Sequence, residues 1–183
     1  MKGFVITSIL FFMLVTPLFA QQNDLEFNSF HKNIYAELLG SHIVGGVNFD
    51  MRLKRGHTDG IGFRVGVGGL SVAANDQNTS LSFGLVTFPL EFNHLLGKKR
   101  SFLITGVGLL PVYAAVSAKG EITNNEYVSE EGFAFIGGFL TIGYRFQPKK
   151  SGIMFQANWN PMILRGSGFN ASWLGLGLGF GFK

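Results

Sequence analysis

The sequence predicts an all-β protein, an eight-stranded antiparallel up-and-down transmembrane β-barrel. Short segments alternate apolar and polar residues with a period of two, which is the side-chain repeat of a β-strand. The chain of 183 residues is 46% hydrophobic, with 26 glycines and 20 phenylalanines, and only 14% of its residues are charged, against about 25% in a typical soluble domain. After residue 20 no apolar run reaches the roughly 20 residues that a spanning helix needs. The hydrophobicity is therefore carried by strands.

The first segment, "MKGFVITSILFFMLVTPLFA", has Lys2, an unbroken apolar centre and a small residue before a polar stretch. This pattern predicts a secretory signal at residues 1–20, cleaved after Ala20, and export to the cell outer membrane. A retained anchor helix is the alternative, which Pro17 and the short apolar run disfavour. A short polar segment at residues 21–32 and a barrel at residues 33–183 follow. The chain has no cysteine, so we expect no disulfide, no thiolate metal site and no lipid anchor on a cysteine.

Turn signals divide the rest into eight strands, near residues 33–40, 43–53, 60–70, 79–93, 101–116, 132–147, 151–164 and 171–182. In "VNFDMRL", "IGFRVGVG", "LTIGYRF" and "FQANW" one face is apolar and the other is polar, charged or glycine. The closing "WLGLGLGFGFK" sets leucine and phenylalanine against a row of glycines. Only "GSHI" separates the first two strands, which leaves one bent strand as an alternative. The alternation changes phase within the fourth strand and predicts a bulge near Pro89.

Two kinds of β-protein show this alternation of apolar and polar residues, and they differ in the surroundings of the charged face. In a soluble sandwich or a lipocalin-like binder the charged face meets water and the apolar face meets the core. In a membrane barrel the apolar face meets lipid and the polar face lines the lumen. The apolar rows here are long and aromatic, and the opposite rows mix both signs of charge with glycine. Glycine suits a narrow interior in which neighbouring side chains interleave, so the membrane barrel is favoured.

The connections between the strands alternate in charge. With a periplasmic N-terminus, the periplasmic connections read "KRGHTDG", "GKKR" and "QPKKSG", whereas the outward ones include "VAANDQN" and the long "SAKGEITNNEYVSEE". Because the basic residues adjoin an apolar belt, outer-membrane lipid headgroups or the cell wall are the expected partners of the net charge of +4, and not nucleic acid. The polar, acidic loop at residues 117–131 is the expected contact site for a surface partner.

Six charged residues fall on the inward rows: Glu37, Asp50, Arg52, Arg64, Glu91 and Arg145. Three carboxylates and three guanidinium groups in a narrow lumen should pair, because an unpaired buried charge is costly. We therefore predict a structural plug of salt bridges. A path for protons or small ions along the same residues is the alternative, and it is disfavoured because eight strands leave an interior only wide enough for side chains.

A lipid-modifying enzyme is the competing functional class. Its only candidate residues are Glu37, Ser41 and His42, and neighbouring strand residues point to opposite faces, so Ser41 and His42 could meet only in a turn. The four histidines lack metal-ligand spacing, and the glycine rows do not match a dinucleotide-binding pattern. We predict no catalytic residue, no cofactor and no metal, and a structural or surface-interaction role.

With the strands in place, the sequence resembles the small eight-stranded outer-membrane barrels, and more narrowly an uncharacterised family of them from Bacteroidetes-type bacteria. The resembling segments are "YAELLG", "NFDMRL", "FRVGVG", "FPLEFNHLLG", "GYRFQPKKSG", "NWNP" and "WLGLGLGFGF", which span most of residues 33–182. Ile104 departs from the resemblance, which implies an acidic residue there. The resemblance implies a fold and a location but no agreed activity. The C-terminal strand is the expected recognition signal for the outer-membrane assembly machinery.

Overall fold

The structure is a computed structural model, and it describes residues 29–75, 80–119 and 128–183. Its strands are β1 (Lys32–Leu39), β2 (Gly45–Arg52), β3 (Gly60–Asn75), β4 (Ser80–Thr87), β5 (Leu90–Lys98), β6 (Ser101–Lys119), β7 (Val128–Phe146), β8 (Gly152–Trp159), β9 (Met162–Leu164), β10 (Gly168–Asn170) and β11 (Leu174–Phe182). Within these ranges no helix is long and apolar enough to cross a membrane. The expected signal peptide lies outside the described residues.

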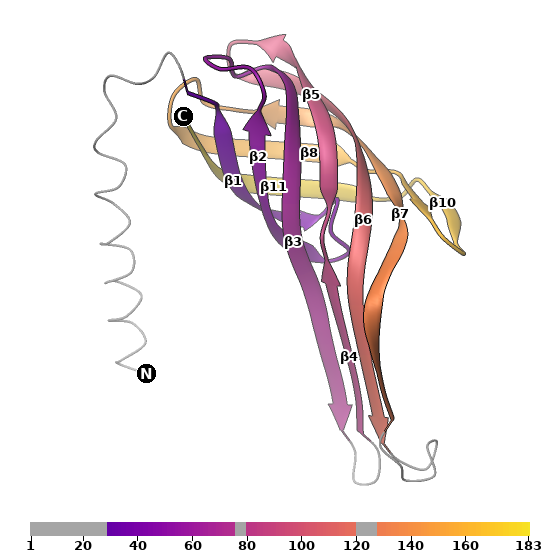
Figure 1. Ribbon diagram of the computed structural model, residues 1–183. Coiled ribbons are helices and arrows are strands. Elements are labelled where there is room, and N and C mark those ends of the chain that lie inside the picture. The colour runs from indigo at the N-terminus through magenta and orange to yellow at the C-terminus, as the bar shows by residue number, and fades with distance from the viewer. Residues whose placement is uncertain (1–28, 76–79, 120–127) are drawn as a thin grey trace, which may run out of the picture.

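The strands form one antiparallel sheet that closes on itself (Figure 1). β1 pairs with β2 on one side and with β11 on the other. β4 and β5 are two parts of one strand that lies between β3 and β6. In the same way β8 and β9 are two parts of one strand beside β7, and β10 and β11 are two parts of the last strand. The eleven segments are therefore eight strands in up-and-down order, and the predicted eight-stranded barrel is confirmed.

The glycine row of β11 faces the lumen. Leu174, Leu176 and Leu178 are 61%, 56% and 62% exposed on the outer wall, whereas Gly177 is buried between them. A Cβ added to Gly177 would lie 3.0 Å from Cδ2 of Tyr35, and a Cβ on Gly179 would overlap the same residue. The glycines therefore leave room for a large lumen side chain of the neighbouring strand.

Two features of the predicted strands are corrected. β1 and β2 are separate strands that pair from Lys32↔Met51 to Leu38↔Gly45, so the single bent strand is wrong. β4 and β5 keep one register against both neighbours, so no bulge lies near Pro89. Pro89 cannot donate a ladder hydrogen bond, but its carbonyl accepts one from Gly66 N at 2.9 Å. The register shift lies instead between β6 and β7, at Leu109/Pro111.

Strands β3, β4, β6 and β7 continue past the barrel and project from the end opposite the C-terminus (Figure 1). We call residues 69–75, 80–86, 111–119 and 128–136 the extension. Three of its strands are longer than predicted, because β3 reaches Asn75, β6 reaches Lys119 and β7 begins at Val128. A cluster of aromatic rings at its base joins Tyr113 to Phe133, with centroids 5.0 Å apart, and Phe133 to Phe88 at 6.1 Å. Phe133 is exposed, and the other two rings are half-buried.

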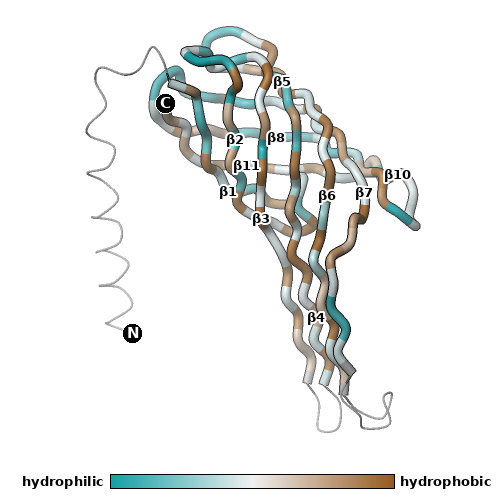
Figure 2. The backbone as a smooth tube through the Cα atoms, viewed as in Figure 1, coloured by the Kyte–Doolittle hydropathy of each residue, from teal (hydrophilic) through white to brown (hydrophobic). Residues whose placement is uncertain are grey.

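The two faces of the extension exchange polarity relative to the barrel wall. Paired residues share a face and alternate residues along a strand share a face. The face continuous with the lumen is mainly apolar, with Val72 paired to Phe83 and Phe83 paired to Val116. It also carries Glu130, which pairs with Val116. The opposite face carries serines, and the hydroxyl groups of Ser117 and Ser129 lie 3.2 Å apart. In Figure 2 hydrophobic residues, drawn brown, continue along the tube into the extension.

Candidate functional site

The lumen holds all six charged residues that the sequence places on inward rows. Each of them is buried, and they come from five strands: Glu37 on β1, Asp50 and Arg52 on β2, Arg64 on β3, Glu91 on β5 and Arg145 on β7. Their side chains form two ion-pair groups, one centred on Asp50 and one on Arg64.

Asp50 lies between two guanidinium groups. Nη2 of Arg52 donates to both of its carboxylate oxygens at 2.7 Å, and Nη1 of Arg145 donates at 2.9 Å. The amide of Asn93 donates to Oδ2 at 2.9 Å. One carboxylate thus serves two cations, and this group carries a formal charge of +1.

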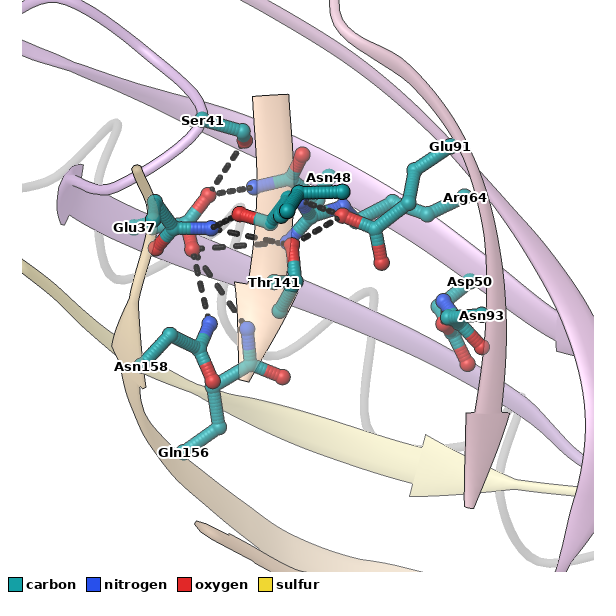
Figure 3. Close-up of polar contacts among 12 residues, drawn as sticks. Glu37, Ser41, Asn48, Asp50, Arg64, Glu91, Asn93, Thr141, Gln156 and Asn158 are labelled. Atoms are coloured by element: carbon teal, nitrogen blue, oxygen red, sulfur yellow. Dashed lines mark hydrogen bonds and ion pairs between the residues drawn. The ribbon is translucent and has the colours of Figure 1, made fainter. Parts of the chain in front are cut away.

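Arg64 lies between two carboxylates, so the second group carries a formal charge of −1. Nη2 of Arg64 pairs with Oε2 of Glu91, and Nη1 lies 3.4 Å from Oε1 of Glu37 and donates to the Tyr35 hydroxyl at 2.9 Å. Oε2 of Glu91 also accepts a hydrogen bond from Thr141 at 2.7 Å. Figure 3 shows this group, with Asp50 and Asn93 to one side.

Neutral side chains complete the network and join its two halves. Glu37 accepts hydrogen bonds from Ser41 at 2.7 Å, Asn48 at 3.2 Å and Asn158 at 3.3 Å (Figure 3). Gln156 accepts one from Nε of Arg145 at 2.9 Å and donates one to Glu37 at 3.4 Å. The charges of +1 and −1 are therefore linked into one neutral network. Sequence reasoning did not assign roles to these amides, although they occupy the same inward rows as the charges.

Apolar clusters lie on both sides of the network. Along β6 the inward row reads Phe102, Ile104, Gly106, Gly108, Leu110 and Val112. Phe102 and Ile104 pack with Leu95 in one cluster, near the turn to β5, and Leu110 and Val112 pack in the other with Phe139 and Met162. Between them the carboxylate of Glu91 packs against Gly106, since a Cβ on Gly106 would lie 2.7 Å from Oε1 of Glu91. Ile104 therefore belongs to an apolar cluster.

Ser41 and His42 lie in the turn between β1 and β2, and both are buried. Ser41 donates to Glu37. The ring nitrogens of His42 lie 3.1 Å from Oγ1 of Thr87 and 3.3 Å from Oδ1 of Asn48. No hydrogen bond between Ser41 and His42 is present in the described part of the chain, so the two do not form a nucleophile and base pair.

The remaining histidines lie apart. His57 is exposed in the turn after β2, with Nδ1 at 3.3 Å from Oδ1 of Asp59. His31 is buried just before β1, and burial lowers the pKa of its ring from 6.5 to about 4. His94 lies on β5. Among residues 29–75, 80–119 and 128–183, no three His, Asp or Glu side chains are grouped to hold a metal ion.

Solved structures with a similar fold share little sequence with this chain. Ail, the attachment invasion locus protein of Yersinia pestis, in complex with the heparin analogue sucrose octasulfate, has a TM-score of 0.49 and 12% identity over 84% of this chain and 97% of Ail. CarO of Acinetobacter baumannii has a TM-score of 0.43 and 11% identity over 88% of this chain and 99% of CarO. No protein-family model and no curated protein matches the chain. At these TM-scores the likenesses say nothing about activity or partners.

Proposed function

We propose that the protein is an integral outer-membrane barrel with a closed, salt-bridged lumen, and that it acts as a structural or surface-interaction protein through its extension. In this proposal residues 1–20 are a cleaved signal peptide, residues 21–32 a short N-terminal segment and residues 33–183 the barrel. The C-terminal strand is the segment that the assembly machinery recognises, and outer-membrane lipids surround the belt. Exposed apolar side chains on every barrel strand support the membrane location.

The observation that carries the proposal is the exchange of polarity at the base of the extension. A barrel wall in contact with lipid needs apolar residues outside, whereas a sheet in water needs polar residues on its free face. The outer face changes from residues such as Leu109, 51% exposed, to Ser117 and Ser129. Aromatic residues gather at the transition around the exposed Phe133, as they do where barrels cross the membrane interface.

A structural role for the lumen charges follows from their pairing. Glu37, Asp50 and Glu91 are matched by three arginines, and the amides occupy other hydrogen-bonding positions. The flanking apolar clusters disfavour a water-filled path. The buried Ser41 and His42 lack the mutual contact that a hydrolytic or acyl-transfer role requires. We therefore favour a plug over the conductor and the lipid-modifying enzyme.

The extension is the proposed interaction element because its strands project past the barrel and carry the connection between β6 and β7, within the predicted contact region at residues 117–131. Residues 120–127 of that loop lie outside the described residues. Binding sites on barrels and sandwiches are typically built on loops held by such scaffolds. Its mainly apolar inner face, which includes Leu81, Val72 and Phe83, offers a contact surface that the outer serines do not.

The location and the plug are tested on membranes. We expect the protein to partition into detergent and to stay out of the aqueous phase; a protein that folds and remains soluble without detergent would be a secreted binder. In planar bilayers we expect no steady conductance. A steady conductance that Arg64→Ala abolishes would make it a conductor. If deleting the gene alters lipid A, and the intact gene restores it but the His42→Ala variant does not, the protein is an enzyme.

The interaction role is tested on cells that display the protein. Deleting residues 119–130 should leave folding intact and remove attachment to immobilised protein, polysaccharide or lipid coats. A variant with Val72→Ser and Phe83→Ser should have the same effect, and its matched control is Ser82→Ala with Ser117→Ala on the opposite face. Equal attachment by all four proteins would refute the interaction role of the extension.

A further inference from the structure

The basic residues of the chain gather at the end of the barrel opposite the extension. Nine of the 15 lysines and arginines lie there, in the turns β2–β3, β5–β6 and β7–β8, at the start of β1 and at the C-terminus. We call them the basic rim: Lys32, Lys54, Arg55, Lys98, Lys99, Arg100, Lys149, Lys150 and Lys183. Antiparallel pairing brings these segments to one end of the barrel, where the turns are teal in Figure 2.

Acidic side chains are scarce at this end. Of the described carboxylates, Glu37, Asp50 and Glu91 are in the lumen, and Glu130 and Glu131 are on the extension. Asp59, beside His57, and the C-terminal carboxylate are the acidic groups of the rim in the described part of the chain. In the described part of the chain the nine cations of the rim therefore outnumber its two acidic groups.

The rim adjoins the apolar belt directly. Lys54 follows Leu53, which is exposed on the outer wall, and Lys98 comes two residues after the exposed Leu96. Ile153, also exposed, comes three residues after Lys150. With a strand rise of about 3.3 Å per residue, the cations lie within roughly 10 Å of the belt. Lysine and arginine at that depth extend their apolar stems along the wall and place the charge at the headgroup level.

The backbone of one turn favours the same interpretation. Lys99 and Arg100 form a two-residue turn between β5 and β6, and Lys99 has a φ of 63°. Turns of this length usually place glycine or asparagine where φ is positive. A basic side chain occupies this position instead, although the conformation is less favourable for lysine than for glycine. In the neighbouring turn the guanidinium of Arg55 lies 5.0 Å from the centroid of Phe30, which orients it.

We propose that the basic rim binds the phosphate groups of anionic phospholipids in the membrane leaflet that it faces. The proposal rests on the membrane location proposed above. Each lysine or arginine near a membrane surface adds to the attraction for anionic lipid, and the attraction decays over a Debye length of about 8–10 Å. Headgroup phosphates lie within that distance of the rim, which favours lipid over the more distant cell wall as its partner.

The test uses the full mature protein reconstituted with spin-labelled phosphatidylglycerol or phosphatidylcholine. We expect the motionally restricted fraction to show a several-fold preference for phosphatidylglycerol at low salt, and the preference to fall in 1 M salt. A variant with Lys54→Gln, Arg55→Gln, Lys98→Gln, Arg100→Gln and Lys149→Gln should lose most of it. Arg165→Gln, an exposed cation outside the rim, is the control and should retain it.

The outcomes separate this inference from the membrane location. If neither lipid shows a restricted fraction, the protein is not embedded and the proposed location fails. A restricted fraction without a preference for phosphatidylglycerol would show that the proposed lipid role of the rim is wrong. A preference that the five substitutions leave unchanged would show the same. Retention on purified peptidoglycan that those substitutions abolish, without lipid preference, would assign the rim to the cell wall.

Discussion

Replacing Arg64 with methionine should destabilise the barrel more than any single change at its surface. Arg64 pairs with Glu91 and Glu37 and donates to the Tyr35 hydroxyl. After its loss Glu37 keeps its hydrogen bonds from Ser41 and several amides. Within the described residues Glu91 keeps only its hydrogen bond from Thr141. Breaking a buried ion pair by removing one partner costs about 3–5 kcal/mol. We expect a loss in that range, most of it from Glu91.

The origin of that loss is measured with a second substitution. Adding Glu91→Gln to Arg64→Met removes the stranded charge, so the double variant should be about 1–3 kcal/mol more stable than Arg64→Met alone. Urea unfolding in detergent or lipid gives the free energy, with Trp159 and Trp173 as fluorescence probes, and the midpoint should move without a change in slope. Arg165→Met is the exposed control. An Arg64→Met protein within 1 kcal/mol of wild type, or a double variant no better than the single one, would refute the pairing account.

Three further predictions follow from the wall, one turn and one buried ring. Leu176→Arg should lower the free energy of unfolding by about 2–4 kcal/mol if Leu176 lies near the bilayer midplane. Gly177→Leu should lower it by about 1–3 kcal/mol by crowding Tyr35. Equal tolerance of both substitutions in urea unfolding would contradict the assigned faces. Lys99→Gly should stabilise the barrel by roughly 0.5–1 kcal/mol, because it relieves the positive φ, and an unchanged midpoint would contradict that. The pKa of His31 is lower in the folded protein, so the unfolded chain binds the proton more readily. The free energy of unfolding should therefore fall by about 2 kcal/mol from pH 8 to pH 5 through this group. His31→Asn should remove that part of the pH dependence of stability.

The barrel and its lumen charges were predictable because a period of two survives along most strands. Asp50 and Arg52, two residues apart, had to share a face, and the glycines of β11 had to oppose its leucines. The full lengths of β3, β6 and β7 were not predicted, because the apolar residues change faces in the extension. Ser117 and Ser129 were therefore interpreted as loop residues. The sequence predicted a bulge near Pro89 because the effect of a proline on the ladder cannot be told from sequence. In the structure the register is kept by hydrogen bonds from Gly66 N to the Pro89 carbonyl and from Phe88 N to the Pro111 carbonyl.

The inward turn at Ser41 and His42 also escaped prediction, and its cause is local. Leu39 and Gly40 both have positive φ, 57° and 63°. A leucine gives no signal for that conformation. The turn therefore bends into the barrel mouth through backbone angles that the side-chain pattern does not encode, and its residues gain their partners only there.

The glycine row of β11 leaves the closing seam of the barrel with little register information of its own. The segment "LGLGLGFGF" repeats every two residues, so a shift of two residues against β1 would keep leucine or phenylalanine outside and glycine inside. The distinguishing contacts lie beside the repeat, where Trp173 donates to the carbonyl of His42 at 3.3 Å and Gly40 donates to that of Leu174 at 3.1 Å. The buried turn after β1 therefore sets the alignment at which the first and last strands close the barrel.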